Sequence, residues 1–134
     1  MKNGDISNRG GIVVAISCKG TLAVPSEKNI LSKILKKEKY TLNTDAVNLV
    51  DYIFRYTDMQ VVCVAKKTDV SCLGPIGDLP IDKIIYIKDN KDVHDLINSG
   101  RVSYYIDNHL DKFGLSIPKF SYSISDFRSI IRKR

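Results

Sequence analysis

The sequence predicts an α/β fold: a three-layer sandwich with a mostly parallel five-stranded sheet and no large cap domain. Two observations support this prediction. Short runs rich in Val and Ile alternate along the chain with segments whose apolar residues recur at helical spacing. The runs are apolar at almost every position, which is typical of strands covered by helices on both faces of a sheet. The 134 residues have the length of one domain, with an expected core over residues 11–131, a short polar N-terminal tail and a basic C-terminal end.

The first half of the chain is expected to contain two strands and two helices. Residues 11–16 (GIVVAI) are a continuous apolar run and predict a strand buried on both faces. Residues 26–38 carry Ile and Leu at helical spacing among several lysines, so an amphipathic helix is expected there. A second helix begins at Thr44, with the acidic Asp45 in its first turn. Residues 60–65 (QVVCVA) predict the second buried strand.

The second half continues the alternation of strands and helices. Gly and Pro residues follow the second strand, so a mostly irregular loop is expected there. Gly100 ends the short helix that follows the third strand, and Ser125 caps the last helix. The loop is expected over residues 66–80, the third strand over 83–88 and the short helix over 89–99. A fourth strand over 102–106, a loop over 107–118 and a weaker strand over 119–124 follow.

Ligands of parallel α/β sheets bind outside the carboxyl ends of the strands. The segments that directly follow the expected strands are residues 17–21, 66–68, 88–91 and 107–111. Any binding or catalytic site is therefore expected to be built from these segments.

The first of these segments carries a partial motif. Residues 12–22 read IVVAISCKGTL, and they resemble the haloacid dehalogenase (HAD) superfamily of phosphatases and phosphotransferases, whose pattern is four apolar residues followed by Asp-x-Asp-Gly-Thr-Leu. The sequence keeps the Gly-Thr-Leu of this pattern at residues 20–22. Ser17 and Lys19 stand where the resembled family has its two aspartates.

The middle segments follow the order of the resembled family but depart from it in residue type. The second strand would normally end in Ser or Thr, whereas Ala65 and Lys66 stand there. The lysine that neutralises the phosphate in the family corresponds to Lys88 or Lys91, and the sequence leaves both open.

The last segment keeps half of a motif. Asp107 and Asn108 follow the fourth strand where the family has a pair of acids, so one acid is kept and the other is replaced. The resemblance spans roughly residues 11–131, and about 22 residues separate Thr21 from Thr44, which is too few for a large cap domain.

These departures bear directly on the chemistry that the resemblance implies. In enzymes of this family the first aspartate is the nucleophile, the second is the general acid/base, and both hold Mg²⁺ together with the late acids. Ser17 would need a base to lose its proton, and no His lies near it in the sequence. Lys19 repels a cation instead of binding it. The altered motif therefore predicts no phosphatase activity, no metal site and no cofactor.

Two arrangements remain open for the altered strand ends. In the first, the Lys19 ammonium occupies the position of the missing Mg²⁺ and forms an ion pair with Asp107. In the second, hydroxyl, ammonium and backbone N–H groups form a metal-free anion pocket. The candidate residues for this pocket are Ser17, Lys19, Gly20, Thr21, Lys88 and Lys91.

The net charge of +6 is concentrated in two basic segments, the first expected helix and the C-terminal end. Basic patches of this kind bind acidic protein surfaces or nucleic acid. We expect an acidic protein surface as the partner, with nucleic acid as the alternative, and the oligomeric state stays open. The candidate contact residues are Lys33, Lys36, Lys37, Arg128, Arg132, Lys133 and Arg134.

The Cys and His residues form no metal or disulfide pattern. The three cysteines contain no Cys-x-x-Cys pair, and Cys63 lies in an apolar run, where a thiol is usually a small core residue. Cys72 falls in the expected loop. His94 is expected on the exposed side of its helix, and His109 belongs to a contiguous Asp-Asn-His triplet that lacks the spacing of metal ligands.

The sequence also indicates a compartment. No apolar run approaches the roughly 20 residues needed to span a bilayer. Residues 1–10 are polar and lack the apolar centre of a signal peptide. We therefore expect a cytoplasmic protein that does not contact membranes.

Together these features predict a catalytically inactive, HAD-like pseudoenzyme that acts as a binding or regulatory module on a protein partner. Small, lysine-rich proteins without catalytic motifs are common in bacteriophages, where they bind host machinery in the host cytoplasm. A residual phosphatase or nucleotide-binding protein is the first alternative. A nucleic-acid-binding protein that uses the basic segments is the second.

Overall fold

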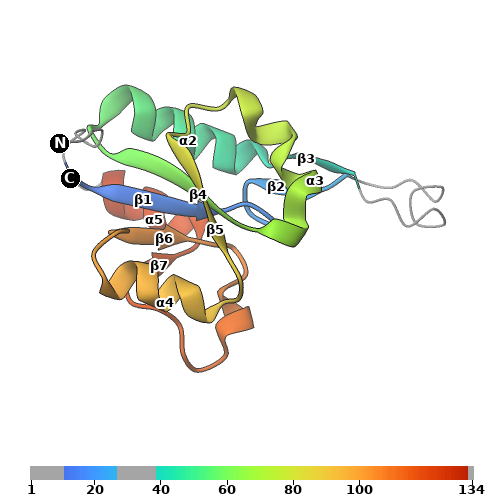
Figure 1. Cartoon of the computed structure of the whole chain (residues 1–134). Coiled ribbons are helices and arrows are strands. Elements are labelled where there is room, and N and C mark those ends of the chain that lie inside the picture. The colour runs from blue at the N-terminus through green and yellow to red at the C-terminus, as the bar shows by residue number, and fades with distance from the viewer. Residues whose placement is uncertain (1–10, 27–38, 133–134) are drawn as a thin grey trace.

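The computed structural model describes residues 11–26 and 39–132, and a five-stranded sheet lies at its centre (Figure 1). The strands lie in the order β5-β4-β1-β6-β7, and every neighbouring pair is parallel. This sheet confirms the predicted α/β fold, and the described part of the chain contains no large cap domain. The strands cover Val13–Ser17 (β1), Gln60–Lys66 (β4), Lys83–Ile87 (β5), Tyr104–Ile106 (β6) and Ser121–Tyr122 (β7).

Helices cover both faces of the sheet and complete the three layers. α2 (Thr44–Tyr56) and α5 (Ile124–Arg132) share one core cluster on one face. α4 (Lys91–Asn98) belongs to a second core cluster on the opposite face. Figure 1 shows α2 and α4 on opposite sides of the strands.

The strands contribute side chains to both clusters because successive residues of a strand point to opposite faces. In β1, Val14 and Ile16 pack toward α2 and α5, while Ala15 packs toward α4. Both large side chains are fully buried, and full burial of a Val or Ile contributes about 1.5–3 kcal/mol. The continuous apolar run in the sequence therefore reflects a central strand that is covered on both faces, as predicted.

The helix ends follow the expected chemistry with one shift. The Asn43 side chain accepts a hydrogen bond of 3.1 Å from the backbone N–H two residues later, so Asn43 caps α2. Ser123, and not Ser125, caps α5, because its hydroxyl accepts the backbone N–H of Asp126 at 3.2 Å. Gly100 follows α4 with φ of +82°, which confirms it as the stop.

A short hairpin that the sequence did not predict lies beside the carboxyl ends of the strands. β2 (Ala23–Pro25) pairs in antiparallel fashion with β3 (Tyr40–Leu42). Residues 27–38 of the helix expected over residues 26–38 lie outside the described residues, and Ser26 is not helical.

The segment after β4 is more regular than expected. In place of a mostly irregular loop over residues 66–80, it contains a 3₁₀ turn at Lys67–Asp69, the short helix α3 (Val70–Leu73) and a second 3₁₀ turn at Pro75–Asp78. Another 3₁₀ turn, Leu110–Phe113, lies in the loop between β6 and β7. Both of these strands are shorter than the sequence indicated.

Candidate functional site

Polar residues gather at the carboxyl ends of the strands, as the topology predicts, around a cavity of about 400 Å³. The end of β1 and the turn after it contribute Ser17, Lys19 and Gly20 to its wall, and the loop after β6 contributes His109 and Lys112. The other lining residues come from the ends of β4, β5 and β6 and from the turns beyond them: Val64, Ala65, Lys66, Asp69, Ile87, Asn90 and Tyr105.

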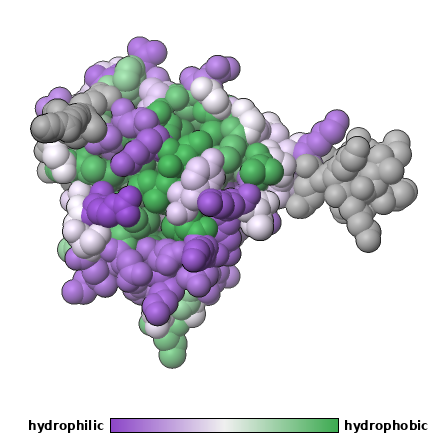
Figure 2. All heavy atoms as spheres, viewed as in Figure 1, coloured by the Kyte–Doolittle hydropathy of each residue, from purple (hydrophilic) through white to green (hydrophobic). Residues whose placement is uncertain are grey.

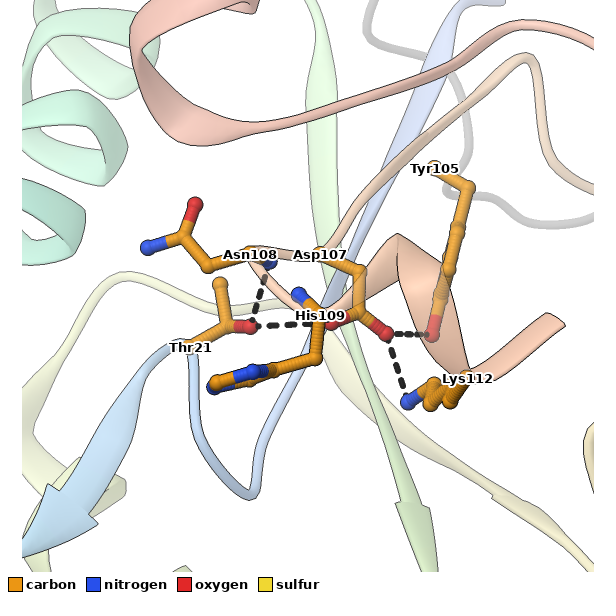
Figure 3. Close-up of polar contacts among 6 residues, drawn as sticks. All are labelled: Thr21, Tyr105, Asp107, Asn108, His109 and Lys112. Carbon is orange, nitrogen blue, oxygen red and sulfur yellow. Dashed lines mark hydrogen bonds and ion pairs between the residues drawn. The ribbon is translucent and has the colours of Figure 1, made fainter. Parts of the chain in front are cut away.

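Asp107 lies next to this cavity and is completely buried, with 0% of its surface exposed. One carboxylate oxygen, Oδ1, accepts the Thr21 hydroxyl at 3.3 Å and the backbone N–H of His109 at 2.8 Å. The other, Oδ2, accepts the Tyr105 hydroxyl at 2.6 Å and the Lys112 ammonium at 2.6 Å. Figure 3 shows these donors converging on the carboxylate from three sides.

The carboxylate therefore has a donor for each of its strong acceptor positions. A carboxylate that ligates Mg²⁺ must offer a free oxygen lone pair to the cation. In this structure a cation could bind Asp107 only by displacing one of these four donors. The part of the chain that the structure describes contains no cluster of three or more His, Cys, Asp or Glu side chains suited to hold a metal ion.

The cation that pairs with Asp107 is Lys112, so the expectation that Lys19 would form this ion pair was wrong. Lys19 is exposed at the rim of the cavity. The chain turns away from the sheet at this residue, because the next residue, Gly20, has a φ of +87° and its N–H donates to the Ala23 carbonyl. The ammonium of Lys112 instead reaches back from the 3₁₀ turn after β6, and the side chain is 33% exposed.

Asn108 has a structural role at this site. Its backbone N–H donates to the Thr21 hydroxyl at 3.0 Å, and its side-chain oxygen accepts the backbone N–H of Ile124 at 3.0 Å. The side chain thus satisfies a free N–H group at the start of α5. Asn108 connects the loops after β1 and β6 to this helix, and its oxygen is already used there.

The Tyr105 hydroxyl is held in its protonated form. Burial raises the pKa of Tyr105 well above its ordinary value, and the adjacent negative charge of Asp107 raises it further. The Ser17 side chain lies near the same hydroxyl. Among the described residues, Ser17 has no hydrogen-bonded base that could remove its proton.

Gly20 and His109 fit against each other in a way that the sequence did not reveal. A Cβ atom added to Gly20 would lie 2.7 Å from Cδ2 and 2.9 Å from Nε2 of His109. The positive φ of Gly20 favours a residue without a side chain, and a Cβ there would also require the exposed His109 ring to shift. The imidazole therefore covers the turn that in the resembled family carries the catalytic motif.

Neither Lys88 nor Lys91, the candidates for the phosphate-binding lysine, lines the cavity. The backbone N–H groups of Lys88 and Asp89 donate to the Asp92 carboxylate at 2.7 and 3.3 Å. The hydrogen bond from the Lys88 N–H is the main reason that the pKa of Asp92 is lowered. Because these two N–H groups already donate to the Asp92 carboxylate, they are not free for an external anion.

Lysines that the sequence did not single out line the cavity instead. Lys66, Lys112 and the predicted Lys19 face it together with His109. Asp69 is the only acidic residue of its described lining, and Asp107 is neutralised by Lys112. The cavity can thus attract an anion. The Thr21 hydroxyl does not take part, because it donates to Asp107 and accepts from the Asn108 N–H.

The three cysteines are all buried, and none forms a disulfide among the described residues. Cys63 lies in the core, as predicted, and Cys72 is buried in α3, where an irregular loop was expected. The Cys18 thiol donates to the Cys72 carbonyl at 3.4 Å. Interaction with Cys63 and burial raise the pKa of Cys18, and burial raises the pKa of Cys72 to about 11. Protonated thiols are poor nucleophiles, so burial does not activate the Cys18 and Cys72 thiols.

A second set of predicted residues lies on the face formed by α2 and α5. Arg128 and Arg132 line a small hollow of about 80 Å³ together with Tyr52 and Ile131. A neighbouring hollow of about 390 Å³ shares Tyr52 and Ile131 and also includes Tyr56. The other predicted contact residues, Lys33, Lys36, Lys37, Lys133 and Arg134, lie outside the described residues.

Comparison with known proteins adds no family assignment. A scan against protein-family models and searches of curated proteins and of solved structures found no match to this chain. Among the described helices, none has the length and apolar character needed to pass through a membrane.

Proposed function

We propose that this chain is a non-catalytic binding domain on a degenerate HAD-like scaffold and that it acts in the cytoplasm on an acidic protein partner. The observation that carries the proposal is the state of Asp107, whose two oxygens accept four hydrogen bonds or ion-pair contacts from the protein itself. A carboxylate in this state acts as a structural acceptor.

The neighbouring positions support the same proposal. A phosphatase of the resembled type needs a carboxylate nucleophile and a general acid at the end of the first strand, where this chain has Ser17 and Lys19. Ser17 lies beside the protonated Tyr105, which already donates its proton to Asp107. The end of the first strand therefore lacks the carboxylate nucleophile and the general acid of the resembled family, and Asp107 offers no free oxygen to a metal.

The face formed by α2 and α5 is the best candidate for the contact with a protein. The rings of Tyr52 and Tyr56 lie 5.1 Å apart on α2, and both side chains are exposed. Arg128 and Arg132 lie beside Tyr52 and form no ion pair within the described part of the chain. Tyr and Arg are enriched at the energetic centres of protein interfaces, and unpaired arginines favour an acidic partner.

Charge reversal on this face tests the proposal. The immobilised full chain would be compared with R128E/R132E and with K67E/K119E, a control that reverses two exposed lysines elsewhere. We expect R128E/R132E to capture at least tenfold less of an acidic protein from the cell extract than the wild type captures. The control should capture as much as the wild type. Equal capture by all three chains contradicts the proposed surface, and turnover of a phosphate ester with Mg²⁺ contradicts the non-catalytic role.

The same experiment also tests whether the chain binds nucleic acid. If the captured material is DNA or RNA and binding weakens steeply as salt rises, the arginines contact phosphates and the protein partner is excluded. The compact size and positive charge are common features of bacteriophage proteins that bind host machinery, which makes a bacterial extract the first choice.

A second candidate function is anion binding in the cavity at the strand ends. It is favoured by the three lysines that face this cavity, Lys19, Lys66 and Lys112. A ligand that binds only the folded state raises Tm. We expect inorganic phosphate or pyrophosphate to raise the Tm of the wild type but not of K19M/K66M. The matched control K88M/K91M should respond like the wild type, and an unchanged wild-type Tm eliminates this candidate.

A further inference from the structure

The strand β5 forms one edge of the five-stranded sheet, and its outer side has no strand partner in the described part of the chain. The backbone N–H of Asp82 donates inward to the Val61 carbonyl at 2.8 Å. Because backbone groups alternate in direction along a strand, the N–H and C=O groups of residues 83, 85 and 87 point outward. An edge of this kind is a ready template for pairing with another chain.

Natural proteins usually protect such an edge, and apart from the exposed Lys83 at its start, β5 lacks the common forms of protection. Its sequence, KIIYI, contains no proline, and it stays in continuous register with β4 over all five residues without a bulge. A groove of about 530 Å³ follows the strand and continues to α4. The Tyr86 side chain in this groove is 47% exposed. Figure 2 shows hydrophobic residues in the middle of the face that β5 crosses and hydrophilic residues below them, over α4.

We propose that β5 pairs with β5 of a second copy of this chain, antiparallel and around a twofold axis at Ile85. The outward-pointing backbone groups fit this register. Ile85 would lie opposite Ile85 of the second copy. Residue 83 of each copy would lie opposite residue 87 of the other. Each of these opposed pairs can exchange two hydrogen bonds, as in an ordinary antiparallel ladder. The two sheets would then form one continuous sheet, and the open edge would be removed.

The side chains on the other register positions favour the same arrangement. Ile84 would lie opposite Tyr86 of the second copy, and an aromatic residue opposite a β-branched residue is a stabilising cross-strand pair. At the two ends of the strand, Asp82, whose Oδ2 also accepts the Val61 N–H at 3.0 Å, would lie opposite the exposed Lys88 of the second copy. Opposite charges at directly facing positions stabilise an antiparallel pair.

The charges along the groove also match in an antiparallel dimer. α4 follows β5 through a tight turn and runs back along it, so Asp92 and Asp95 line the groove near the end of β5 and Arg101 lines it near the start. The antiparallel arrangement brings the Arg101 end of one groove to the acidic end of the other. A parallel arrangement would place like charges together, which is unfavourable.

The mass of the full chain in solution, measured by light scattering and sedimentation, tests this dimer. We expect a species of twice the chain mass of 15.1 kDa. Y86K should weaken the dimer at least tenfold without changing the circular dichroism spectrum, because Tyr86 is exposed in the single chain. K119E, a charge change at an exposed residue away from β5, is the matched control and should leave the mass unchanged.

A charge exchange makes the test specific to this interface. R101E and D95R should each weaken the dimer, because each places like charges across the axis, and R101E/D95R should restore it. In the dimer, hydrogen exchange should slow at the amides of residues 83, 85 and 87. A wild-type chain that stays monomeric at the highest soluble concentration overturns the proposal. A dimer that is indifferent to Y86K and to the charge exchange also overturns it, because that dimer uses another surface.

Discussion

Replacing Asp107 with Asn should lower the free energy of unfolding by about 2–4 kcal/mol. The buried carboxylate accepts from Thr21 and the His109 N–H on one oxygen and from Tyr105 and Lys112 on the other. The amide of Asn can accept on one atom only, because its other terminal atom is a donor. In the more favourable orientation the Asn oxygen takes the place of Oδ2 and keeps the contacts with Tyr105 and Lys112. The NH₂ group then takes the place of Oδ1 and faces two other donors, the His109 N–H and the Thr21 hydroxyl.

The magnitude follows from what this orientation loses. The His109 N–H cannot turn to accept a hydrogen bond, so it is left without a partner, at a cost of about 1–3 kcal/mol. The Lys112 contact loses its charge assistance, but Lys112 is 33% exposed and can be solvated, so this loss is discounted to about 1 kcal/mol. For a chain of this length the total corresponds to a decrease in Tm of about 8–15 °C.

Urea denaturation at neutral pH, followed by circular dichroism, measures this change. Asp111→Asn is the matched control, since Asp111 is exposed in the same loop and its replacement should change stability by less than about 0.5 kcal/mol. If Asp107→Asn is neutral or stabilising, the carboxylate is not a structural acceptor. Such a result would return Asp107 to the role of a functional acid and would contradict the proposed non-catalytic domain.

Three further predictions concern neighbouring groups. Because folding raises the pKa of Tyr105, its stabilising contribution is complete below the unfolded pKa of about 10 and is lost as pH rises above it. Stability measured between about pH 9 and 11 should therefore fall more steeply in the wild type than in Tyr105→Phe, and equal slopes would argue against a buried phenol. Gly20→Ala should cost about 1–3 kcal/mol in urea denaturation, and His109→Ala in the same chain should recover only the part due to the collision, not the part due to the positive φ. With its pKa raised to about 11, the Cys72 thiol should not react with a disulfide reagent at neutral pH until the chain is unfolded, and rapid labelling of the native chain would show that α3 opens.

The parts of the fold that the sequence predicted are those that local pattern determines. The strands β1 and β4 are continuous apolar runs because both of their faces are covered, and this burial is visible in the residues themselves. The hairpin of β2 and β3 leaves no such signal. Its strands have three residues each, and the segment between them is too long to be a tight turn with a recognisable sequence.

The candidate site was predicted in its position but not in its contacts. Strand ends meet at one edge of a parallel sheet, so the approach of Thr21 to Asp107 follows from topology. The choice between Lys19 and Lys112 depends on the path of the loop after β6, which no local pattern determines. One signal was present in the sequence, because Asp107 directly follows β6 two residues after Tyr105, and residues two apart in extended backbone lie on the same side.

On the proposed HAD-like scaffold, the ion pair of Lys112 with Asp107 would let the fold persist without the metal chemistry of the resembled family. In enzymes of the resembled family, the acids at this position help to hold a metal ion. In this chain, a lysine, two hydroxyls and a backbone N–H supply the positive partners, and all of them belong to the protein. Once the internal cation is present, a metal would have to compete with it for a buried carboxylate, and the two states exclude each other. On the proposed scaffold, Ser17 and Lys19 in place of the two motif aspartates leave fewer negative charges for a metal to neutralise, which is consistent with Lys112 as the resident cation of the site.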